Sequence, residues 1–99
     1  MRRWTTVRII GPSMEPALRT GDWWIVRPTH RIRVGQVVAV RHPERPHLIV
    51  VKRVVRREGD AWWLEGDNAD ASDDSRSFGA VPEEGILGVL WWRYRRAPR

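Results

Sequence analysis

The sequence has no cysteine, only one lysine and no long apolar run in its 99 residues. Without cysteine the chain can form no disulfide, no thiolate nucleophile and no zinc site with cysteine ligands. The longest apolar run covers residues 86–92, whereas a membrane-spanning helix needs roughly 18 residues or more. The N-terminus also lacks the apolar stretch of a secretory signal. These absences predict a protein that resides in the cytoplasm and does not cross a membrane.

Positive charge is in excess, with 18 basic against 12 acidic residues and a net charge of +6. The basic residues are spread along the chain and alternate with apolar ones, as in Arg31-Ile32-Arg33 and Arg93-Tyr94-Arg95. This alternation is typical of the solvated face of a sheet. A nucleic-acid interface instead gathers its basic side chains into a patch. The distribution argues against nucleic acid and favours an anionic membrane surface or an acidic partner.

Short β-branched and aromatic runs alternate with glycine and proline turns, and no segment has sustained helical periodicity. We therefore expect a single domain over residues 1–99, mostly β, built as a small antiparallel sheet that is curled or barrel-like. The longest expected strand is apolar on both alternating faces and should be buried on both. The expected strands cover residues 5–10, 23–26, 37–40, 48–56, 61–64 and 86–94.

The one lysine, Lys52, lies within the longest expected strand, where an ammonium is poorly solvated. A desolvated lysine can lose its proton near neutral pH, whereas an arginine stays protonated at any working pH. Ser13 is a candidate partner for such a base, because Pro12 and Pro16 present it rigidly after the first expected strand. Pro12 also favours an extended conformation at Gly11. The residues therefore suggest a Ser13/Lys52 catalytic dyad.

Residues 66–79 are polar and acidic, as a calcium-binding loop would be. An EF-hand loop takes oxygen ligands from its third and fifth positions and a glutamate from its twelfth. Here those two positions hold Ala69 and Ala71, and no glutamate closes the loop. The three histidines are too dispersed for a metal site or a Ser-His triad, and the proline loop that follows His42 predicts solvent exposure for that side chain. We expect no metal and no cofactor.

Three separated stretches form an ordered set of motifs. They are Ser13-Met14-Glu15-Pro16-Ala17-Leu18 with Gly21-Asp22, then Lys52-Arg53-Val54, then Gly66-Asp67-Asn68 continuing through Ser72, Asp74, Ser75, Arg76 and Gly79. Together they resemble the type I signal peptidase family, and residues 35–40 are similar to the family's remaining strand motif. The match spans residues 9–90 in the family's order. The resemblance implies the fold of the signal-peptidase catalytic core.

The resemblance also implies roles for individual residues. Ser13 would be the nucleophile and Lys52 the general base. Ser72 would hydrogen-bond the lysine amine and orient it, and Asp74 with Arg76 would hold the loop against the site. Burial and a neighbouring uncharged hydroxyl would both favour the neutral amine that the mechanism requires.

The oxyanion site is only partly identified. The Ser13 backbone N–H would donate to the oxyanion of the reaction intermediate. Some family members place a serine two residues before the nucleophile as a second donor, but this position is Gly11 here, as in other members. Pro12 has no N–H to offer, so the second donor stays unassigned.

From the sequence we expect neither the N-terminal membrane anchor nor the large inserted domain of many family members. The chain therefore most resembles short soluble members, such as the protease that matures nickel-type superoxide dismutase. We expect a serine endopeptidase that removes an N-terminal leader or pro-segment, with the precursor of that dismutase as substrate. Signal-peptide cleavage at a membrane surface is one alternative, and a non-catalytic module of the same fold that binds peptide or nucleic acid is another. A self-cleaving repressor-type protease has a similar dyad, but residues 66–79 argue against it.

Trp-Trp pairs occur at residues 23–24, 62–63 and 91–92, each within an expected strand. Because side chains alternate along a strand, one indole of each pair should enter the core and the other should face outward. The outward indoles would form an apolar rim that suits peripheral contact with a membrane, or the gripping of a protein substrate added as an extended strand beside Ser13. The pattern leaves the oligomeric state open.

Overall fold

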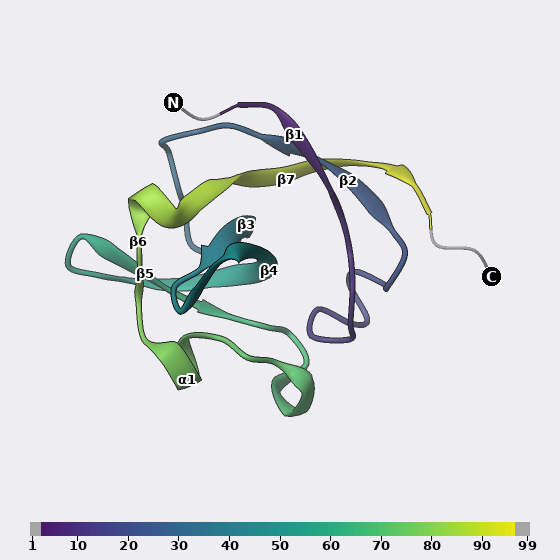
Figure 1. Cartoon of the computed structure of the whole chain (residues 1–99). Coiled ribbons are helices and arrows are strands. Elements are labelled where there is room, and N and C mark those ends of the chain that lie inside the picture. Colours follow the sequence, from purple (N-terminus) through teal and green to yellow (C-terminus); the bar gives the residue numbers. More distant parts are fainter. Residues whose placement is uncertain (1–2, 97–99) are drawn as a thin grey trace.

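The computed structural model describes residues 3–96, and within them the chain forms one seven-stranded sheet with three short helical turns (Figure 1). The strand order is β1-β2-β7-β3-β4-β5-β6, and all neighbours pair antiparallel. The predicted mostly β, antiparallel class is confirmed. No helix among these residues is long and apolar enough to span a membrane. The strands are β1 (Thr5–Arg8), β2 (Trp23–Arg27), β3 (Val37–His42), β4 (Arg45–Glu58), β5 (Ala61–Glu65), β6 (Val81–Pro82) and β7 (Ile86–Arg95), and the helical turns are η1 (Ala69–Ala71), α1 (Ser75–Phe78) and η2 (Glu83–Gly85).

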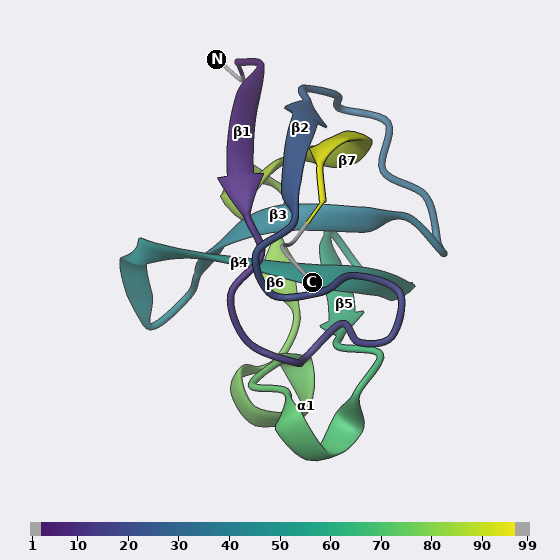
Figure 2. The same ribbon diagram turned by 90° about the vertical axis from the view of Figure 1, so that its right-hand side faces the viewer.

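The sheet is open and strongly curled, and β7 joins its two halves. In Figure 2, β1 and β2 lie vertically, in opposite directions, whereas β3 and β4 run across the view. Strand β7 pairs with β2 on one side and β3 on the other, with register shifts in both ladders that allow it to bend. Gly88 lies at this crossing, where a Cβ would collide with the Arg27 carbonyl oxygen. The curl brings the β1–β2 half close to β4.

Three apolar clusters form the core among the described residues. The largest is built mainly from inward side chains of β3 to β7, among which Val38, Val54 and Leu64 are almost completely buried. A second holds the two halves together, since it joins buried side chains of β1, β2 and β3. In a smaller cluster Ile9, Met14 and Leu18, from the connection between β1 and β2, pack against side chains of β3, β4 and β7. The connection that carries Ser13 is therefore anchored in the core.

The central strand β4 differs from its prediction in length and in burial. It begins three residues earlier than expected, and Leu48 and Ile49 are each about 40% exposed (39% and 42%). Only the region around Lys52 and Val54 is buried as predicted. Strand β5 pairs with β4 only from Arg53 onward, so within the described residues the earlier part of β4 is paired on one side only, with β3.

One indole of the tryptophan pair packs on the core in two of the three cases. Trp62 is buried, while Trp63 is half-buried under the Arg56 guanidinium, 4.4 Å from its ring centroid. Trp24 likewise packs on the core. The prediction is wrong for Trp91 and Trp92, which are 53% and 60% exposed. Strand β3 pairs with β7 only as far as Val89, so among the described strands the outer end of β7 is paired with β2 alone.

The prediction that the His42 side chain is exposed to solvent is also wrong. His42 is the last residue of β3 and only 2% exposed. Its ring is covered by Phe78 of α1, with centroids 4.8 Å apart in an edge-on arrangement. The proline turn that follows is exposed, but the loop over residues 66–79 folds back over the histidine itself.

Leu64→Ala tests the location of the core. Leu64 is fully buried, so the substitution leaves a cavity and should lower the free energy of unfolding by about 3 kcal/mol. Leu48→Ala is the matched control, because Leu48 is partly exposed, and it should change stability by about 0.5 kcal/mol or less. Urea denaturation followed by tryptophan fluorescence measures both, and equal effects would contradict this assignment of the core.

Candidate active site

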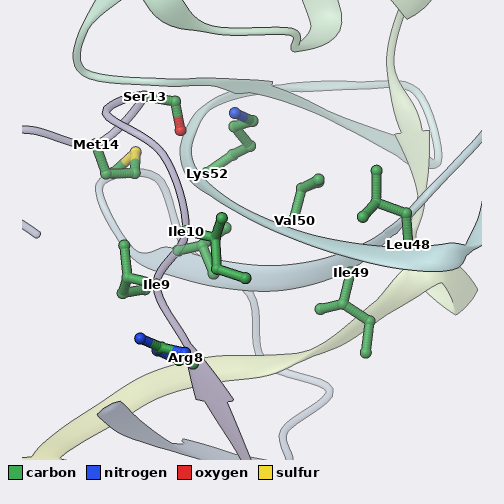
Figure 3. A pocket seen from close by; sticks show the side chains of 10 residues that line it. Arg8, Ile9, Ile10, Ser13, Met14, Leu48, Ile49, Val50 and Lys52 are labelled. Carbon is green, nitrogen blue, oxygen red and sulfur yellow. The ribbon is translucent and has the colours of Figure 1, made fainter. Parts of the chain in front are cut away.

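Ser13 and Lys52 line the same pocket, although they come from different halves of the sheet. Ser13 lies on the connection between β1 and β2, and Lys52 lies in the middle of β4. In Figure 3 the Ser13 hydroxyl and the Lys52 amine face one another at one end of the pocket. Apolar side chains, including Ile10 and Leu48, form its remaining walls. The structure therefore brings the two predicted site residues together.

The turn that carries Ser13 is held on both sides. Next to it Met14 is buried in the core and accepts a backbone hydrogen bond from Leu18 N–H. On the other side, Asn68 N–H donates to the Ser13 carbonyl oxygen at 2.8 Å, and the Asn68 side-chain amide donates to the Pro12 carbonyl oxygen. These contacts fix the serine backbone relative to the loop over residues 66–79.

Gly11 has a different conformation from the one expected. Its φ is +87°, in the left-handed region that favours glycine, rather than an extended value. Strand β1 ends at Arg8, and Ile10 is exposed, so the chain has left the sheet before it reaches the glycine. Gly11 therefore makes the bend that turns the chain towards Ser13, and the rigid geometry of Pro12 does not override it.

The amine of Lys52 is in an environment that favours its neutral form. The residue is only 4% exposed, and burial lowers the pKa of the Lys52 amine from its ordinary value. The carboxylates of Asp74 and Asp73 act in the opposite direction and raise that pKa, while the Arg76 guanidinium lowers it. Burial is the largest of these effects, so the net change is downward.

Ser72 connects Lys52 to the loop through two hydrogen bonds, in which its hydroxyl has fixed donor and acceptor roles. Lys52 Nζ donates to Ser72 Oγ at 3.1 Å, and Ser72 Oγ donates to Asp74 Oδ2 at 2.7 Å. A serine hydroxyl has one proton, and here it is committed to the carboxylate. Ser72 can therefore only accept from Lys52, which leaves the lone pair of a neutral amine available to another hydroxyl.

Asp74 is the centre of the loop. Its fully buried carboxylate accepts from Gly66 N–H at 2.8 Å, from Ser72, and from both the backbone and the guanidinium of Arg76. Burial alone would raise the pKa of Asp74, but the hydrogen bonds from Arg76, Gly66 and Ser72 outweigh it and hold the pKa well below its usual range. The carboxylate stays ionised, and the loop is closed around it.

A second ion pair fixes the start of the same loop. The Arg53 guanidinium donates to both carboxylate oxygens of Asp67, each at 2.9 Å, and also to the Gly35 carbonyl oxygen. Arg53 follows Lys52 in β4 and points to the opposite face, where it meets this acidic partner. One strand thus presents the amine on one side and anchors the loop on the other.

Sequence reasoning missed some of the groups that assemble the site. The contacts of Asn68 with the serine turn join residues 56 positions apart and leave no local pattern. The exposed apolar end of β4 was expected in the core and instead lines the pocket. Within residues 3–96 no group of three or more His, Cys, Asp or Glu side chains is arranged to hold a metal ion.

The chain is similar to known peptidases. The family model of S24-like peptidases matches residues 2–87. The chain is 35% identical to the mitochondrial inner membrane protease subunit 1 of Xenopus tropicalis, over 84% of this chain and 64% of that protein. It is 37% identical to the mitochondrial ATP-independent inner membrane protease subunit 1a of Arabidopsis thaliana, over 85% of this chain and 66% of that protein. The human subunit 1 is 31% identical, over 84% and 64%. The chain thus spans slightly less than two thirds of the length of these relatives.

The comparisons correct the predicted location. Cytoplasmic residence was expected from the lack of a signal or a spanning segment, but the relatives are named as inner membrane proteases and point to a membrane-associated location. They also give no support to a nickel-type superoxide dismutase precursor as the substrate.

Gly66→Ala tests the close packing of the site. A Cβ at Gly66 would collide with Ser72 Oγ and lie 2.7 Å from the Ser13 carbonyl oxygen, so the loop or the serine turn must move. We expect a loss of about 2 kcal/mol in the free energy of unfolding, measured by urea denaturation. In the control Gly85→Ala, the new Cβ would meet only Val81, at 3.2 Å, and the loss should be clearly smaller. Equal losses would contradict the packing described.

Proposed function

This chain belongs to the S24-like peptidases as a member of the type I signal peptidase family, and we propose that it hydrolyses peptide bonds with Ser13 as nucleophile and Lys52 as general base. The family predicted from the three motifs is thereby confirmed. The observation that carries the proposed chemistry is the position of the chain's one lysine, which is buried at the end of the pocket that Ser13 also lines.

In the proposed first step, neutral Lys52 removes the proton from Ser13 Oγ as that oxygen attacks the substrate carbonyl carbon. Ser72 supports this step because it accepts from the amine and so directs the lone pair away from itself. The resulting oxyanion would accept from the Ser13 backbone N–H, whose position is set by the buried Met14 and by Asn68.

The remaining steps return the enzyme to its starting state. The Lys52 ammonium gives its proton to the leaving amine as the C–N bond breaks, and the acyl group stays on Ser13 as an ester. Lys52, neutral again, takes a proton from a water molecule whose oxygen attacks the ester carbonyl. The C–O bond to Ser13 breaks, the serine regains its proton from the ammonium, and the new carboxylic acid leaves and loses its proton to solvent.

The pocket suggests how a substrate would bind. Residues 8–10 line one side and residues 48–52 line the other, and Ile10, Leu48 and Ile49 are exposed on these segments. An extended peptide lying between two such segments can hydrogen-bond with their backbones and place small apolar side chains against their walls. We propose an N-terminal leader as the substrate, cleaved at a membrane surface. The precursor of nickel-type superoxide dismutase, expected from the sequence, is a second substrate to be tested.

A non-catalytic peptide-binding module of the same fold is the competing proposal. Such a module needs the pocket but has no use for a buried amine with a lowered pKa, which is unfavourable when charged. A binding role also gives no reason for the directed hydrogen bonds from Lys52 through Ser72 to Asp74. These features favour the enzyme.

An exposed aromatic surface supports the membrane part of the proposal. It consists of Trp4, Trp91, Trp92 and Tyr94, each about half exposed. The Trp4 and Trp91 rings meet edge-on with centroids 5.4 Å apart, and the Trp91 and Trp92 centroids are 6.3 Å apart. Tryptophan and tyrosine are enriched where proteins meet the bilayer interface, and a net charge of +6 is attracted to anionic headgroups. We propose that this surface rests on the membrane.

Ser13→Ala and Lys52→Arg test the dyad. Ser13→Ala removes the proposed nucleophile, and the arginine of Lys52→Arg keeps the positive charge but cannot become neutral. Both variants should therefore lose about a thousandfold or more in kcat/KM. Cleavage is measured on a leader peptide with an Ala-X-Ala end presented on vesicles and, in parallel, on the superoxide dismutase precursor, with N-terminal sequencing of the products. Ser77→Ala, on the exposed side of α1, is the matched control. Undiminished cleavage by either site variant would refute the dyad.

Trp91→Ser combined with Trp92→Ser tests the membrane surface. Removing two exposed indoles should weaken partitioning onto anionic phospholipid vesicles by about tenfold or more, since a buried aromatic side chain contributes roughly 1.5–3 kcal/mol. Vesicle co-sedimentation measures the partitioning, and circular dichroism checks that the fold is kept. Unchanged partitioning would show that another surface meets the membrane.

A further inference from the structure

His42 is a buried polar group that the proposed chemistry does not use. It is 2% exposed, and both of its ring nitrogens have partners. Nδ1 accepts from Glu44 N–H at 3.1 Å, so Nδ1 carries no proton. Nε2 lies 2.8 Å from Asp73 Oδ2, and with the ring proton on Nε2 it donates to that carboxylate. The two contacts fit one state of the ring, the neutral tautomer protonated at Nε2.

The partner of His42 lies inside the active-site loop. Asp73 is the residue between Ser72, which accepts from the lysine amine, and Asp74, around which the loop closes. The Asp73 side chain is 57% exposed, so its position is not fixed by burial. Its bond to His42 crosses 31 positions in the sequence and joins the end of β3 to the loop. Phe78, farther along the loop, packs on the same imidazole.

We propose that the hydrogen bond between His42 and Asp73 positions the active-site loop. It fixes the segment that presents Ser72 to Lys52, and it holds the Asp73 carboxylate at a set place near the Lys52 amine. The proposal rests on the proposed function, because it assigns His42 and Asp73 as positioning residues for that reaction. Neither residue needs to touch the substrate.

The electrostatic consequence has a definite sign. The charged groups that act on Lys52 are Asp74, Asp73 and Arg76, all from the loop. On the other side, β3 places Val38 opposite Lys52, and the serine turn adds Ser13 and Met14 in the pocket wall, none of which carries a charge. Arg8 also lines the pocket, but it lies at the opposite end from Lys52 (Figure 3) and is not among the groups that act on the amine. Asp73 stabilises the ammonium and so raises the pKa of Lys52. If Asp73 turned into solvent, screening would weaken this effect, and the pKa would fall.

The chain itself offers a direct measurement, because Lys52 is its one lysine. Protein grown with ¹³C-labelled lysine gives one side-chain signal, and its pH titration reports the midpoint for Lys52 without any substrate. Asp73→Asn keeps an acceptor for His42 but removes the charge, and should lower this midpoint. The acid limb of the kcat/KM–pH profile should move to lower pH by the same amount, since the neutral amine is the reactive form.

The matched control is Asp70→Asn, the same change of charge at an exposed position of the same loop that is not among the groups acting on Lys52. It should leave the midpoint unchanged. His42→Leu should lower the midpoint as Asp73→Asn does, and His42→Gln, which can still donate, should restore it towards the wild-type value. In the double variant with Asp73→Asn, His42→Leu should add no further shift, because the two residues act as one unit.

The outcomes separate this proposal from the proposed function. Two results would overturn the proposed role of the His42–Asp73 hydrogen bond. One is a Lys52 titration midpoint in Asp73→Asn equal to that of the wild type, and the other is a full further shift by His42→Leu in the Asp73→Asn background. These titrations do not depend on activity. Cleavage that survives Ser13→Ala or Lys52→Arg would instead refute the dyad and leave the titration results standing. If His42→Leu does not fold, His42→Phe, which also removes the hydrogen bond to Asp73, takes its place in both comparisons.

Discussion

The buried carboxylate of Asp74 is the constraint on which the rest of the site depends. An ionised carboxylate without water is costly, and it is stable here because backbone N–H groups, a serine hydroxyl and a guanidinium all donate to it. Those donors come from Gly66, Ser72 and Arg76, so satisfying one charge folds the whole loop. It also determines which way the Ser72 hydroxyl points. Asp74 therefore determines whether the Lys52 lone pair is available, although it is linked to the amine only through Ser72.

Much of the fold could be predicted from the alternation of apolar and polar residues, because that alternation is set by the two faces of a strand. It placed all of the longer strands and the antiparallel class. It failed at Leu48, Ile49, Trp91 and Trp92, where apolar side chains are exposed. A strand's own residues do not say where its neighbour ends, and in each case the neighbouring strand stops short. The same exposed residues line the pocket or form the aromatic surface, so the failures of the pattern coincide with the surfaces proposed to bind other molecules.

The site was predictable to the extent that chemistry restricts residue types. A single lysine in an apolar strand stands out, and the motifs joined it to Ser13, Ser72, Asp74 and Arg76, which the structure brings to one place. The geometry of Gly11 was not predictable, because the rule for residues before proline assumes a side chain. His42 was not predictable either, since its burial comes from a loop that lies 31 positions away. Location could not be inferred from what the sequence lacks, and the relatives corrected it.

The place of β7 in the sheet sets when this site can form during folding. Ser13 belongs to the half built from β1 and β2, whereas Lys52 and Ser72 belong to the half built from β3 to β6. In the sheet these two halves are connected through β7, which comes last in chain order among the described strands. Contacts between segments so distant in sequence form late in folding, after the cost of closing long loops has been met. A chain from which β7 has been removed would therefore carry Ser13, Lys52 and Ser72 but lack the strand that joins their two halves of the sheet.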